Sequence, residues 1–447
     1  MKIRSIIRPL SALLALACVS AWASDIRVSK FTDSFDGACD ADCSLREAVQ
    51  LANEQPGPDR ILLRAGVYQL SLPPEHDDDL EPIDEDENAN GDLDVADDLT
   101  ISGKGLDQTS IDGGGIDRVI EVLPGASLYL RTLAVTHGHT ADIGAGIHNR
   151  GTLTIWSVAI VANDASSQAH RSIGGGIAND GGVLAVYASL VDGNVSHPRE
   201  VLFGRGGGIF SSGALTVRET TISNNSTDDD DDLARGGGIY NTGTADIARS
   251  TFTGNSAPYG AAFSNGQGGM ATLSNVTVSG NESEPTNIYA AAVGNEDTGG
   301  TPGHLGRLKL SYVTVAANSG WGVVNRGQLD VRDTIVAGNQ LASGDDASCA
   351  NFAAYTHGGA LLGSQLESGC EADLTIANAD TFRHLLYPLA DNGGRTETHA
   401  LRPQALALDA AVGNCPAQDQ RSSPRPVDGD GDGAAICDIG AYELTPR

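Results

Sequence analysis

Two cysteines and two charged residues with catalytic potential lie within nine positions near the N-terminus: Cys39, Cys43, Arg46 and Glu47. A thiol becomes a nucleophile or a redox centre when nearby cations lower its pKa, so a reactive cysteine beside Arg46 is one interpretation. The surrounding acidic side chains favour the protonated, inert thiol instead, and they are Asp36, Asp40 and Asp42. Cys43 also has a disulfide partner four residues away, so we predict a structural role.

The residues that follow Cys43 predict a short amphipathic helix. Ser44 and Glu47 have the spacing of a capping box, in which each side chain bonds the other residue's exposed amide. Four apolar residues then share one face at helical spacing: Leu45, Ala48, Val49 and Ala52. We predict that this helix covers an open end of the fold, while Arg46 stays unexplained.

Two acidic segments have the spacing of calcium ligands. Residues 75–98 carry thirteen acidic side chains, and most of this stretch is expected to be a solvated loop. Part of it follows the order of oxygen ligands in a calcium loop, without the flanking helices of an EF-hand. The candidate metal ligands are Asp86, Asn88, Asn90, Asp92, Asp94 and Asp97. The alternative is an Asp/Asn-rich turn.

The second acidic segment lies near the C-terminus. Asp428, Asp430 and Asp432 alternate before Gly433, and Asp438 is a further candidate ligand. Alternating carboxylates on a glycine-rich loop can converge on a hard cation such as calcium, and a plain acidic turn is the alternative. Asp228–Asp232, five aspartates in a row, are expected to be an exposed insertion.

A repeat of roughly 30 residues organises the middle of the chain. Similar segments such as 144–155, 174–186, 206–217 and 236–247 carry glycines, an apolar residue and then a polar one. Aligning the copies gives an apolar ladder at Ile147, Ile177, Ile209, Ile239, Phe263, Val293 and Val323. Two residues later comes a polar ladder at Asn149, Asn179, Ser211, Asn241, Asn265, Asn295 and Asn325. A second turn repeats asparagine at Asn163, Asn194, Asn225, Asn255, Asn281, Asn318 and Asn339.

These ladders predict the fold class. Each copy holds short β-branched strands and cannot bury its apolar face alone, so the copies must stack into a solenoid. Asparagine at one turn of every coil can bond the coils before and after it. The chain is therefore predicted to be an all-β, right-handed, single-stranded parallel β-helix. A short N-terminal capping helix and a disulfide-bonded C-terminal cap complete the predicted architecture.

The N-terminal residues and the net charge indicate the compartment of the protein and the classes of partner that are disfavoured. Lys2, Arg4 and Arg8 precede an apolar run and a small-residue cleavage pattern, so residues 1–23 are predicted to be a signal peptide. Export to the periplasm, the outer surface or the medium follows. The formal net charge of −30 makes nucleic acid a poor partner, and no later apolar run is long enough to span a membrane.

Cleavage of the signal peptide would remove Cys18, and the other six cysteines form three close pairs in the sequence. Six cysteines allow fifteen connectivities, of which proximity favours disulfides 39–43, 349–370 and 415–437. Three regions are predicted to follow the signal peptide. They are an N-terminal cap (24–59), the β-helix (60–340, with the acidic insertion 75–98) and a C-terminal cap segment (341–447).

Several motifs resemble one family of bacterial exported proteins. CSLREA at 43–48 matches the motif that names the CSLREA domain, and GDLDVADDLTISG at 91–103 resembles the segment that follows it there. Three C-terminal stretches (389–401, 419–426 and 437–443) resemble the choice-of-anchor segment that ends many such β-helix proteins. The resemblance spans nearly the whole mature chain and implies a β-helix, but it implies no activity. Ser422 stands where the family has glycine.

Ligand-binding candidates lie on the predicted exterior. His148, Phe210 and Tyr240 share one repeat position just past the inward residue, so they are expected to form an exposed stripe that could stack on sugar rings. Arg205 and Arg235 precede equivalent glycine turns and are expected to stack near Asp228–Asp232. They could serve a lyase beside a bound cation, but a structural ion ladder is the favoured interpretation.

Two functions therefore stand. The favoured one is a secreted, calcium-stabilised surface or adhesin-like protein that binds extracellular ligands, carbohydrate above all, without catalysis. The alternative is an extracellular polysaccharide lyase or glycoside hydrolase, because parallel β-helices host such enzymes. The polygalacturonase motifs are out of order here: Asp345-Asp346 follows Arg307-Leu308-Lys309, and residues 137–139 read His-Gly-His. Whether the protein is an enzyme, its ligand and its oligomeric state stay open.

Overall fold

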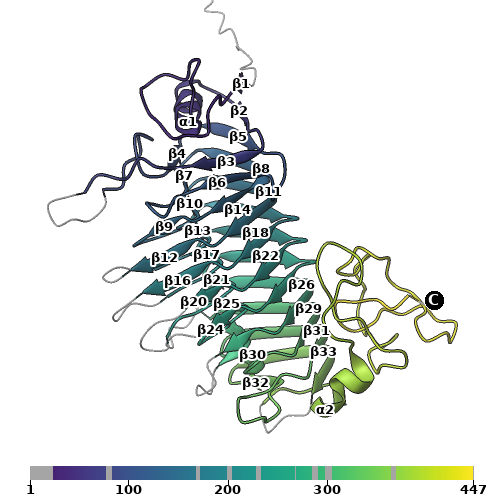
Figure 1. The fold of residues 1–447 in the computed structure, drawn as a ribbon. Coiled ribbons are helices and arrows are strands. Elements are labelled where there is room, and N and C mark those ends of the chain that lie inside the picture. Colours follow the sequence, from purple (N-terminus) through teal and green to yellow (C-terminus); the bar gives the residue numbers. More distant parts are fainter. Residues whose placement is uncertain are drawn as a thin grey trace, which may run out of the picture.

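The computed structural model describes residues 24–76, 83–167, 172–198, 204–227, 233–266, 268–283, 290–296, 305–363 and 369–445. The predicted signal peptide and Asp228–Asp232 lie outside these residues. Within the described part, the strands stack into one long column with three faces (Figure 1). Among the described helices, none is long and apolar enough to cross a membrane.

The largest face is a sheet of eighteen strands, called the long sheet here. Its strands are β1 (Ser24–Ile26), β2 (Asp59–Leu62), β3 (Gly66–Gln69), β5 (Asp98–Ser102), β6 (Thr109–Asp112), β8 (Ser127–Thr136), β11 (Thr152–Val161), β14 (Val183–Tyr187), β15 (Leu190–Asp192), β18 (Ala214–Arg218), β19 (Thr221–Ser223), β22 (Thr244–Ala248), β23 (Thr251–Thr253), β26 (Met270–Ser279), β29 (Arg307–Ala316), β31 (Gln328–Val336), β33 (Ala354–Gly363) and β34 (Leu374–Ile376).

The other two faces are shorter. A ten-stranded sheet contains β4 (Leu93–Val95), β7 (Ile120–Val122), β10 (Ile147–Asn149), β13 (Ile177–Asn179), β17 (Ile209–Ser211), β21 (Ile239–Asn241), β25 (Phe263–Asn265), β28 (Ala291–Asn295), β30 (Trp321–Asn325) and β32 (Cys349–Asn351). A six-stranded sheet contains β9 (His139–Thr140), β12 (Asp164–Ser167), β16 (Val195–Pro198), β20 (Ser226–Thr227), β24 (Ser256–Ala257) and β27 (Glu282–Ser283).

The strands pair in parallel with their equivalents in the next coil, which defines a parallel β-helix. β10 pairs with β13 and β13 pairs with β17, each with its first residue opposite the next strand's first residue. β26 pairs with β29 over nearly its full length in the same way. One circuit of the chain through the faces thus advances the column by one rung, and the predicted fold class is confirmed.

The apolar ladder fills the core of the column. Ile147, Ile177 and Ile209 lie opposite one another in neighbouring rungs and have no exposed surface. Phe263, Val293 and Val323 continue the same row, so the ladder that the repeat predicted is confirmed. Burial of such branched side chains, at about 1.5–3 kcal/mol each, is the main force that stacks the coils.

The asparagine ladders bond coil to coil, as predicted. Nδ2 of Asn194 donates to Oδ1 of Asn225 at 2.9 Å, and Asn225 repeats this bond to Asn255. In the other ladder, Asn149 donates to Asn179 at 2.6 Å. These buried amides satisfy one another along the column, so polar turn residues can be stacked without contact to water.

The N-terminal end is covered by α1 (Leu45–Glu54) (Figure 1). The predicted capping box is present, since Oγ of Ser44 accepts from the amide of Glu47 and the Glu47 carboxylate accepts from the amide of Ser44. The predicted apolar face, Leu45, Ala48, Val49 and Ala52, is buried against the first coils. The helix therefore acts as the expected lid.

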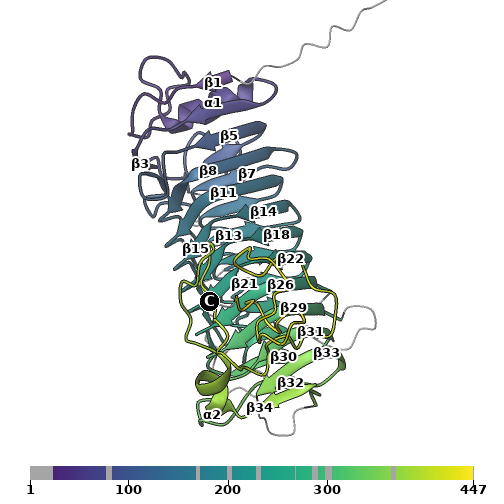
Figure 2. The ribbon, with the colours of Figure 1, turned by 90° about the vertical axis from the view of Figure 1, so that its right-hand side faces the viewer.

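The C-terminal region first continues the column and then folds back along its side. β32 and β33 continue the column beyond the predicted boundary at residue 340. The short helical elements α2 (Asn378–Asp380) and η1 (Thr381–Leu385) follow, and Asn378 ends the asparagine ladder by donating to the carbonyl of Asn339. Residues 386–445 then return along the side of the long sheet (Figures 1 and 2).

This returning segment, called the side strap here, packs on the second halves of the long strands. Its bonds include those of Gln420 to Thr277 and of His399 to Ser279. The three predicted disulfides are confirmed as Cys39–Cys43, Cys349–Cys370 and Cys415–Cys437. The last of these closes a loop within the side strap.

Candidate functional site

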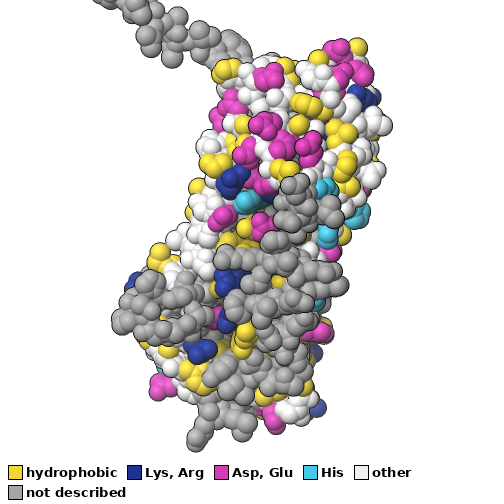
Figure 3. All heavy atoms as spheres, turned by 90° about the vertical axis from the view of Figure 1, so that its left-hand side faces the viewer, with side chains coloured by type: hydrophobic (Ala, Val, Ile, Leu, Met, Phe, Trp, Pro, Cys, Tyr) yellow, Lys and Arg dark blue, Asp and Glu magenta, His cyan; other side chains and the backbone are white. Residues whose placement is uncertain are grey.

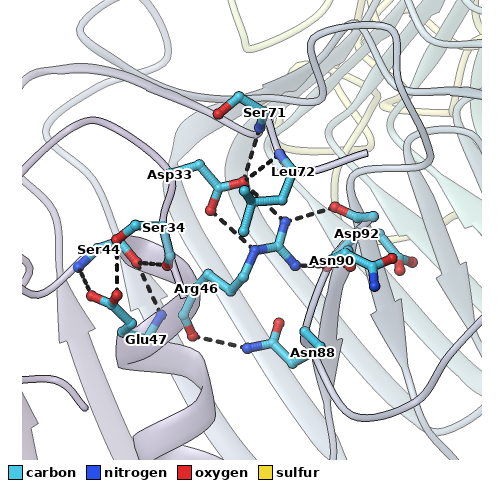
Figure 4. A network of polar contacts seen from close by, with 12 residues as sticks. Asp33, Ser34, Ser44, Arg46, Glu47, Ser71, Leu72, Asn88, Asn90 and Asp92 are labelled. Atoms are coloured by element: carbon cyan, nitrogen blue, oxygen red, sulfur yellow. Dashed lines mark hydrogen bonds and ion pairs between the residues drawn. The ribbon is translucent and has the colours of Figure 1, made fainter. Parts of the chain in front are cut away.

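Arg46, which the sequence left unexplained, joins the N-terminal cap to the acidic loop, defined here as residues 83–98 (Figure 4). The side chain is fully buried, and its Nε and Nη2 donate to the two carboxylate oxygens of Asp33 at 3.0 and 3.1 Å. Nη1 donates to the carbonyls of Asn90 and Asp92, and Nη2 donates to that of Gly91. Because all five N–H groups have an acceptor, Arg46 is a clamp between two segments of the chain.

The predicted calcium loop does not close around one centre. Nδ2 of Asn88 donates to the carbonyl of Arg46, while the amide and Oδ1 of Asn88 bond to Asp94. The carbonyl of Asn90 is held by Arg46. The carboxylate of Asp97 accepts from the amide of Gly57. The side chains of Asn88 and Asp97 are therefore engaged by the cap and the first coil, whereas Oδ1 of Asn90 is buried and has no hydrogen-bond partner among the described residues.

Of the predicted ligands, Asp86 and Asp94 do approach each other. The third carboxylate beside them is Glu121 of β7, and one oxygen from each residue lies within 4.8 Å of the others. Asp94 and Glu121 face each other in register across β4 and β7. Sequence reasoning missed Glu121, although Leu93-Asp94-Val95 and Ile120-Glu121-Val122 share an apolar-acidic-apolar pattern that could have aligned them.

Arg118 links the remaining carboxylates of this region into a buried ion-pair network. Its guanidinium lies 3.1 Å from Asp84, 3.1 Å from Asp92 and 2.7 Å from Glu121. The predicted ligand Asp92 thus pairs with an arginine. Burial raises the pKa of Asp92 well above its usual range, against the opposing charge of Arg118. Acidic side chains gather at the N-terminal end of this face of the molecule (Figure 3).

Glu121 is the best compensated carboxylate of the network. Besides Arg118, it meets Arg150 and lies 3.3 Å from Nδ1 of His148. Burial raises the pKa of Glu121, but the hydrogen bond from His148 and the charges of both arginines outweigh it and hold the pKa at about 2. Glu121 is therefore ionised over the physiological pH range.

The prediction of an exposed stripe is wrong, because its side chains are covered in the structure. His148, Phe210 and Tyr240 do lie in one row and face away from the main core, but they are 9%, 9% and 3% exposed. The rings of Phe210 and Tyr240 stack at 6.2 Å and form a small second apolar cluster with Ala178 and Ile173. A buried row cannot stack on a sugar.

The two arginines of the equivalent turns stack as expected. Arg205 and Arg235 are paired in parallel across neighbouring coils. Arg205 lies 5.4 Å from the ring of Tyr240, and Arg235 forms an ion pair with Glu296, which is 8% exposed. Both arginines thus bind to the protein itself, which favours a structural role over catalysis.

The C-terminal acidic segment forms a turn. Asp428 and Asp430 approach Asp409, a residue that the sequence did not single out. The carboxylate of Asp428 accepts from the amides of Gly431 and Gly433, and that of Asp409 accepts from the amide of Asp430. These bonds are what an acidic turn requires, with or without a cation.

The other two predicted C-terminal ligands lie next to this carboxylate group but are not part of it. Oδ1 of Asp432 accepts from the amide of Ala434. Asp438 is fully buried, and its two carboxylate oxygens accept from the amides of Asp409 and Leu444. Burial raises the pKa of Asp438 to about 7, although these hydrogen bonds oppose it. Asp438 therefore organises the side strap.

A groove that the sequence did not predict crosses the long sheet over β18, β22, β26, β29, β31 and β33. Its volume is about 640 Å³. Six rungs span roughly 24 Å, at ~4.8 Å per rung. The groove lies on the first halves of the long strands, such as Met270 and Thr272 of β26, while the side strap packs on their second halves, such as Thr277 and Ser279 of the same strand. Its floor carries two outward rows, which are Ala214, Thr244, Met270, Arg307, Gln328 and Ala354, and Thr216, Asp246, Thr272, Lys309, Asp330 and Thr356.

The charges in the groove are unevenly compensated. Asp246 pairs with Arg218, and Asp330 accepts from Nε of Arg332 at 2.8 Å. Arg307 and Lys309 are exposed on β29, and neither has a carboxylate partner among the described residues. The groove therefore offers two free cations on a protein whose formal net charge is −30. Sequence reasoning set Arg307 and Lys309 aside as a displaced motif.

Comparisons with known proteins add little beyond the fold. No family model and no curated protein matches the sequence. Among solved structures, the pectate lyase Pel9A is similar with a TM-score of 0.48 and 12% identity, over 95% of this chain and 97% of that chain. The PL6 family alginate lyase AlyGC is similar with a TM-score of 0.32 and 10% identity, over 91% of this chain and 60% of that chain.

Proposed function

We propose that this protein is an exported, calcium-stabilised β-helix that binds a linear acidic polysaccharide along the groove of the long sheet. The observation that carries the proposal is the pair of unpartnered cations, Arg307 and Lys309, in an open groove that runs along the column. An extended groove suits a polymer, and free cations suit the carboxylates of acidic sugars.

The neighbouring residues support a sugar ligand. Thr216, Thr244 and Thr272 line the groove with hydroxyl groups, which can donate to and accept from sugar hydroxyls. Met270, which is 49% exposed, offers an apolar surface beside Arg307 in the same row. Apolar surface with a few polar groups is the usual lining of a ligand site.

Removing the two cations is expected to weaken binding. For Arg307→Ala/Lys309→Ala, we expect the affinity for polygalacturonate or alginate to fall at least about tenfold, since each lost charge pair contributes on the order of 1 kcal/mol or more. Isothermal titration at fixed ionic strength measures this change. Wild-type affinity should also fall as salt rises, because exposed charges are screened.

A matched control is Arg60→Ala/Lys104→Ala, which removes the same two charges from exposed positions away from the groove. This variant should bind like the wild type. Equal binding by the groove variant, or equal affinity for a neutral glucan and the acidic polymers, would overturn the proposal.

An assay for reaction products on the same polymers and variants decides the enzymatic alternative. A lyase would need a cation held by carboxylates beside a basic residue, but Asp246 and Asp330 already pair with arginines. Within the part of the chain that the structure describes, the convergent carboxylate groups lie elsewhere. Unsaturated or reducing-end products that accumulate with the wild type and not with Arg307→Ala/Lys309→Ala would establish catalysis in the groove.

Calcium stabilisation rests on the two places where three carboxylates converge: Asp86, Asp94 and Glu121, and Asp409, Asp428 and Asp430. Oxygen-only donor sets of this kind suit calcium. We expect EDTA to lower the melting temperature and added calcium to restore it, because a ligand that binds only the folded state stabilises it. An unchanged melting temperature in EDTA would remove calcium from the proposal.

We also propose membership of the CSLREA-domain, choice-of-anchor group of exported proteins. The support is the set of motifs, together with the role of Arg46 within the first of them, since it clamps the loop in which the second begins. Three disulfides support an oxidising compartment outside the cytoplasm. Recovery of the mature chain, starting at Ser24, from the periplasm or the medium would test export.

A further inference from the structure

Two buried carboxylates face each other where the acidic loop enters the column. Asp94 of β4 and Glu121 of β7 are direct partners in neighbouring parallel strands, and both are 0% exposed. Like charges placed opposite each other in a sheet destabilise it, and burial strengthens the repulsion. This pair therefore needs positive charge from its surroundings.

The positively charged side chains of this region contact Glu121 and not Asp94. Arg118, Arg150 and His148 all contact Glu121. Asp94 accepts through Oδ2 from the amide of Asn88, but its Oδ1 is buried and has no hydrogen-bond donor among the described residues. Oδ1 of Asp94 is thus left as an oxygen that a cation could contact.

We propose that Asp86, Asp94 and Glu121 hold a divalent calcium ion that fastens the acidic loop to the second rung of the ten-stranded sheet. Their carboxylate oxygens lie within 4.8 Å of one another, a spacing that one ion can bridge at ~2.3–2.6 Å per ligand. The unpartnered Oδ1 of Asp94 is the observation that distinguishes this group from an ordinary acidic patch. Asp86 is exposed, so ions and waters can enter from its side.

Calcium fits this group better than magnesium. The ligands come from a strand, a neighbouring strand and a loop, and calcium accepts such irregular sets and completes them with water. Magnesium demands near-ideal octahedral geometry and sheds water reluctantly. The arrangement differs from the predicted twelve-residue loop, because Glu121 from the next coil belongs to the group, while the side chains of Asn88 and Asp97 bond to the cap and the first coil.

Arg150 competes with the ion. Its Nη2 contacts Asp86 and Glu121, yet its side chain is 33% exposed and can turn towards solvent. Binding therefore exchanges one charge on a partly exposed side chain for two charges on an ion that also reaches Asp94. This competition predicts the direction in which removing Arg150 changes calcium affinity. Removing this arginine should strengthen calcium binding. If the arginine were only a partner in a structural ion pair, its removal should only destabilise the fold.

The test combines calcium titration with thermal melting of the full mature chain. For Asp94→Asn, which keeps the side-chain shape, we expect calcium affinity to fall at least about tenfold, since ligand charge sets the affinity of such sites. In EDTA, Asp94→Asn should melt at or above the wild-type temperature, because the amide oxygen still accepts from Asn88 and no like charge lies opposite Glu121; in calcium, it should melt below the wild type. For Arg150→Gln, calcium affinity should rise.

The control is Asp428→Asn in the other carboxylate group, which should leave the calcium response of the Asp94 site intact. The inference specifies one calcium site of the proposed function and does not depend on polysaccharide binding. If calcium raises the melting temperature of the wild type and of Asp94→Asn equally, this site is overturned while calcium stabilisation stands. If Asp94→Asn melts below the wild type in EDTA as well, its role is structural and the inference fails.

Discussion

Replacing Arg46 by alanine is expected to lower the free energy of unfolding by about 3–5 kcal/mol, the usual result of removing one partner from a buried ion pair. The side chain is 0% exposed and Asp33 is 2% exposed, so the substitution leaves the Asp33 carboxylate without its counter-ion. It also leaves the carbonyls of Asn90, Gly91 and Asp92 without their buried donor. Urea denaturation measures the loss, and limited proteolysis should cut faster within residues 83–98.

Two variants control for this effect. Arg60→Ala removes an arginine whose ion pair with Asp25 is half exposed, at 3.6 Å, and should change stability by no more than about 0.5 kcal/mol. Arg46→Lys keeps the charge but cannot bond three carbonyls and a carboxylate at once, so it should lie between the wild type and Arg46→Ala. A loss below about 1 kcal/mol for Arg46→Ala, within the range of a routine substitution, would refute the clamp.

The clamp also explains why the sequence misdirected the metal assignment. The order of acidic and amide residues in Asp86–Asp97 does match a calcium loop, but spacing along the chain cannot show which side chains another segment will engage. Arg46 fixes the carbonyl of Asn90 and Arg118 takes the carboxylate of Asp92. The convergent group that results needs Glu121, which belongs to the next coil.

The stacking of the column could be predicted in detail, because aligning the copies of the repeat also gives the register between strands of neighbouring coils. Once Ile147, Ile177 and Ile209 are aligned, parallel pairing follows, and the same alignment places each asparagine above the next. The groove was not predictable in this way. Arg307 and Lys309 lie on one strand, and whether they are free depends on Arg218 and Arg332 pairing with the neighbouring aspartates.

The exposed stripe failed for a related reason. The repeat correctly places His148, Phe210 and Tyr240 in one outward row, but facing away from the core is not the same as facing water. Ile173 and Ala178 pack against the two rings, and Arg118 and Glu121 surround the histidine. Whether other residues cover an outward row depends on tertiary packing. The alignment of the repeat copies carries no information about that packing.

The second large effect is expected at the centre of the asparagine ladder. Oδ1 of Asn225 accepts from the backbone amide and from Nδ2 of Asn194, at 3.0 and 2.9 Å, and its Nδ2 donates to the carbonyl of Val191 and to Asn255. Asn225→Ala leaves two buried donors of Asn194 without an acceptor, and each unsatisfied group costs about 1–3 kcal/mol. We expect the free energy of unfolding to fall by about 3 kcal/mol, measured by urea denaturation.

The neighbouring Ser226→Ala is the matched control, because Ser226 is partly exposed and its hydroxyl makes no hydrogen bond among the described residues; it should change stability by no more than about 0.5 kcal/mol. Of the two variants, Asn225→Ala interrupts the chain of amides that runs from coil to coil and Ser226→Ala leaves it intact. Equal stability of Asn225→Ala and Ser226→Ala would mean that apolar stacking alone holds the coils in register. A selective loss at Asn225 would mean that each coil depends on its neighbours for satisfied turns, so that removing one amide weakens the coils on both sides of it.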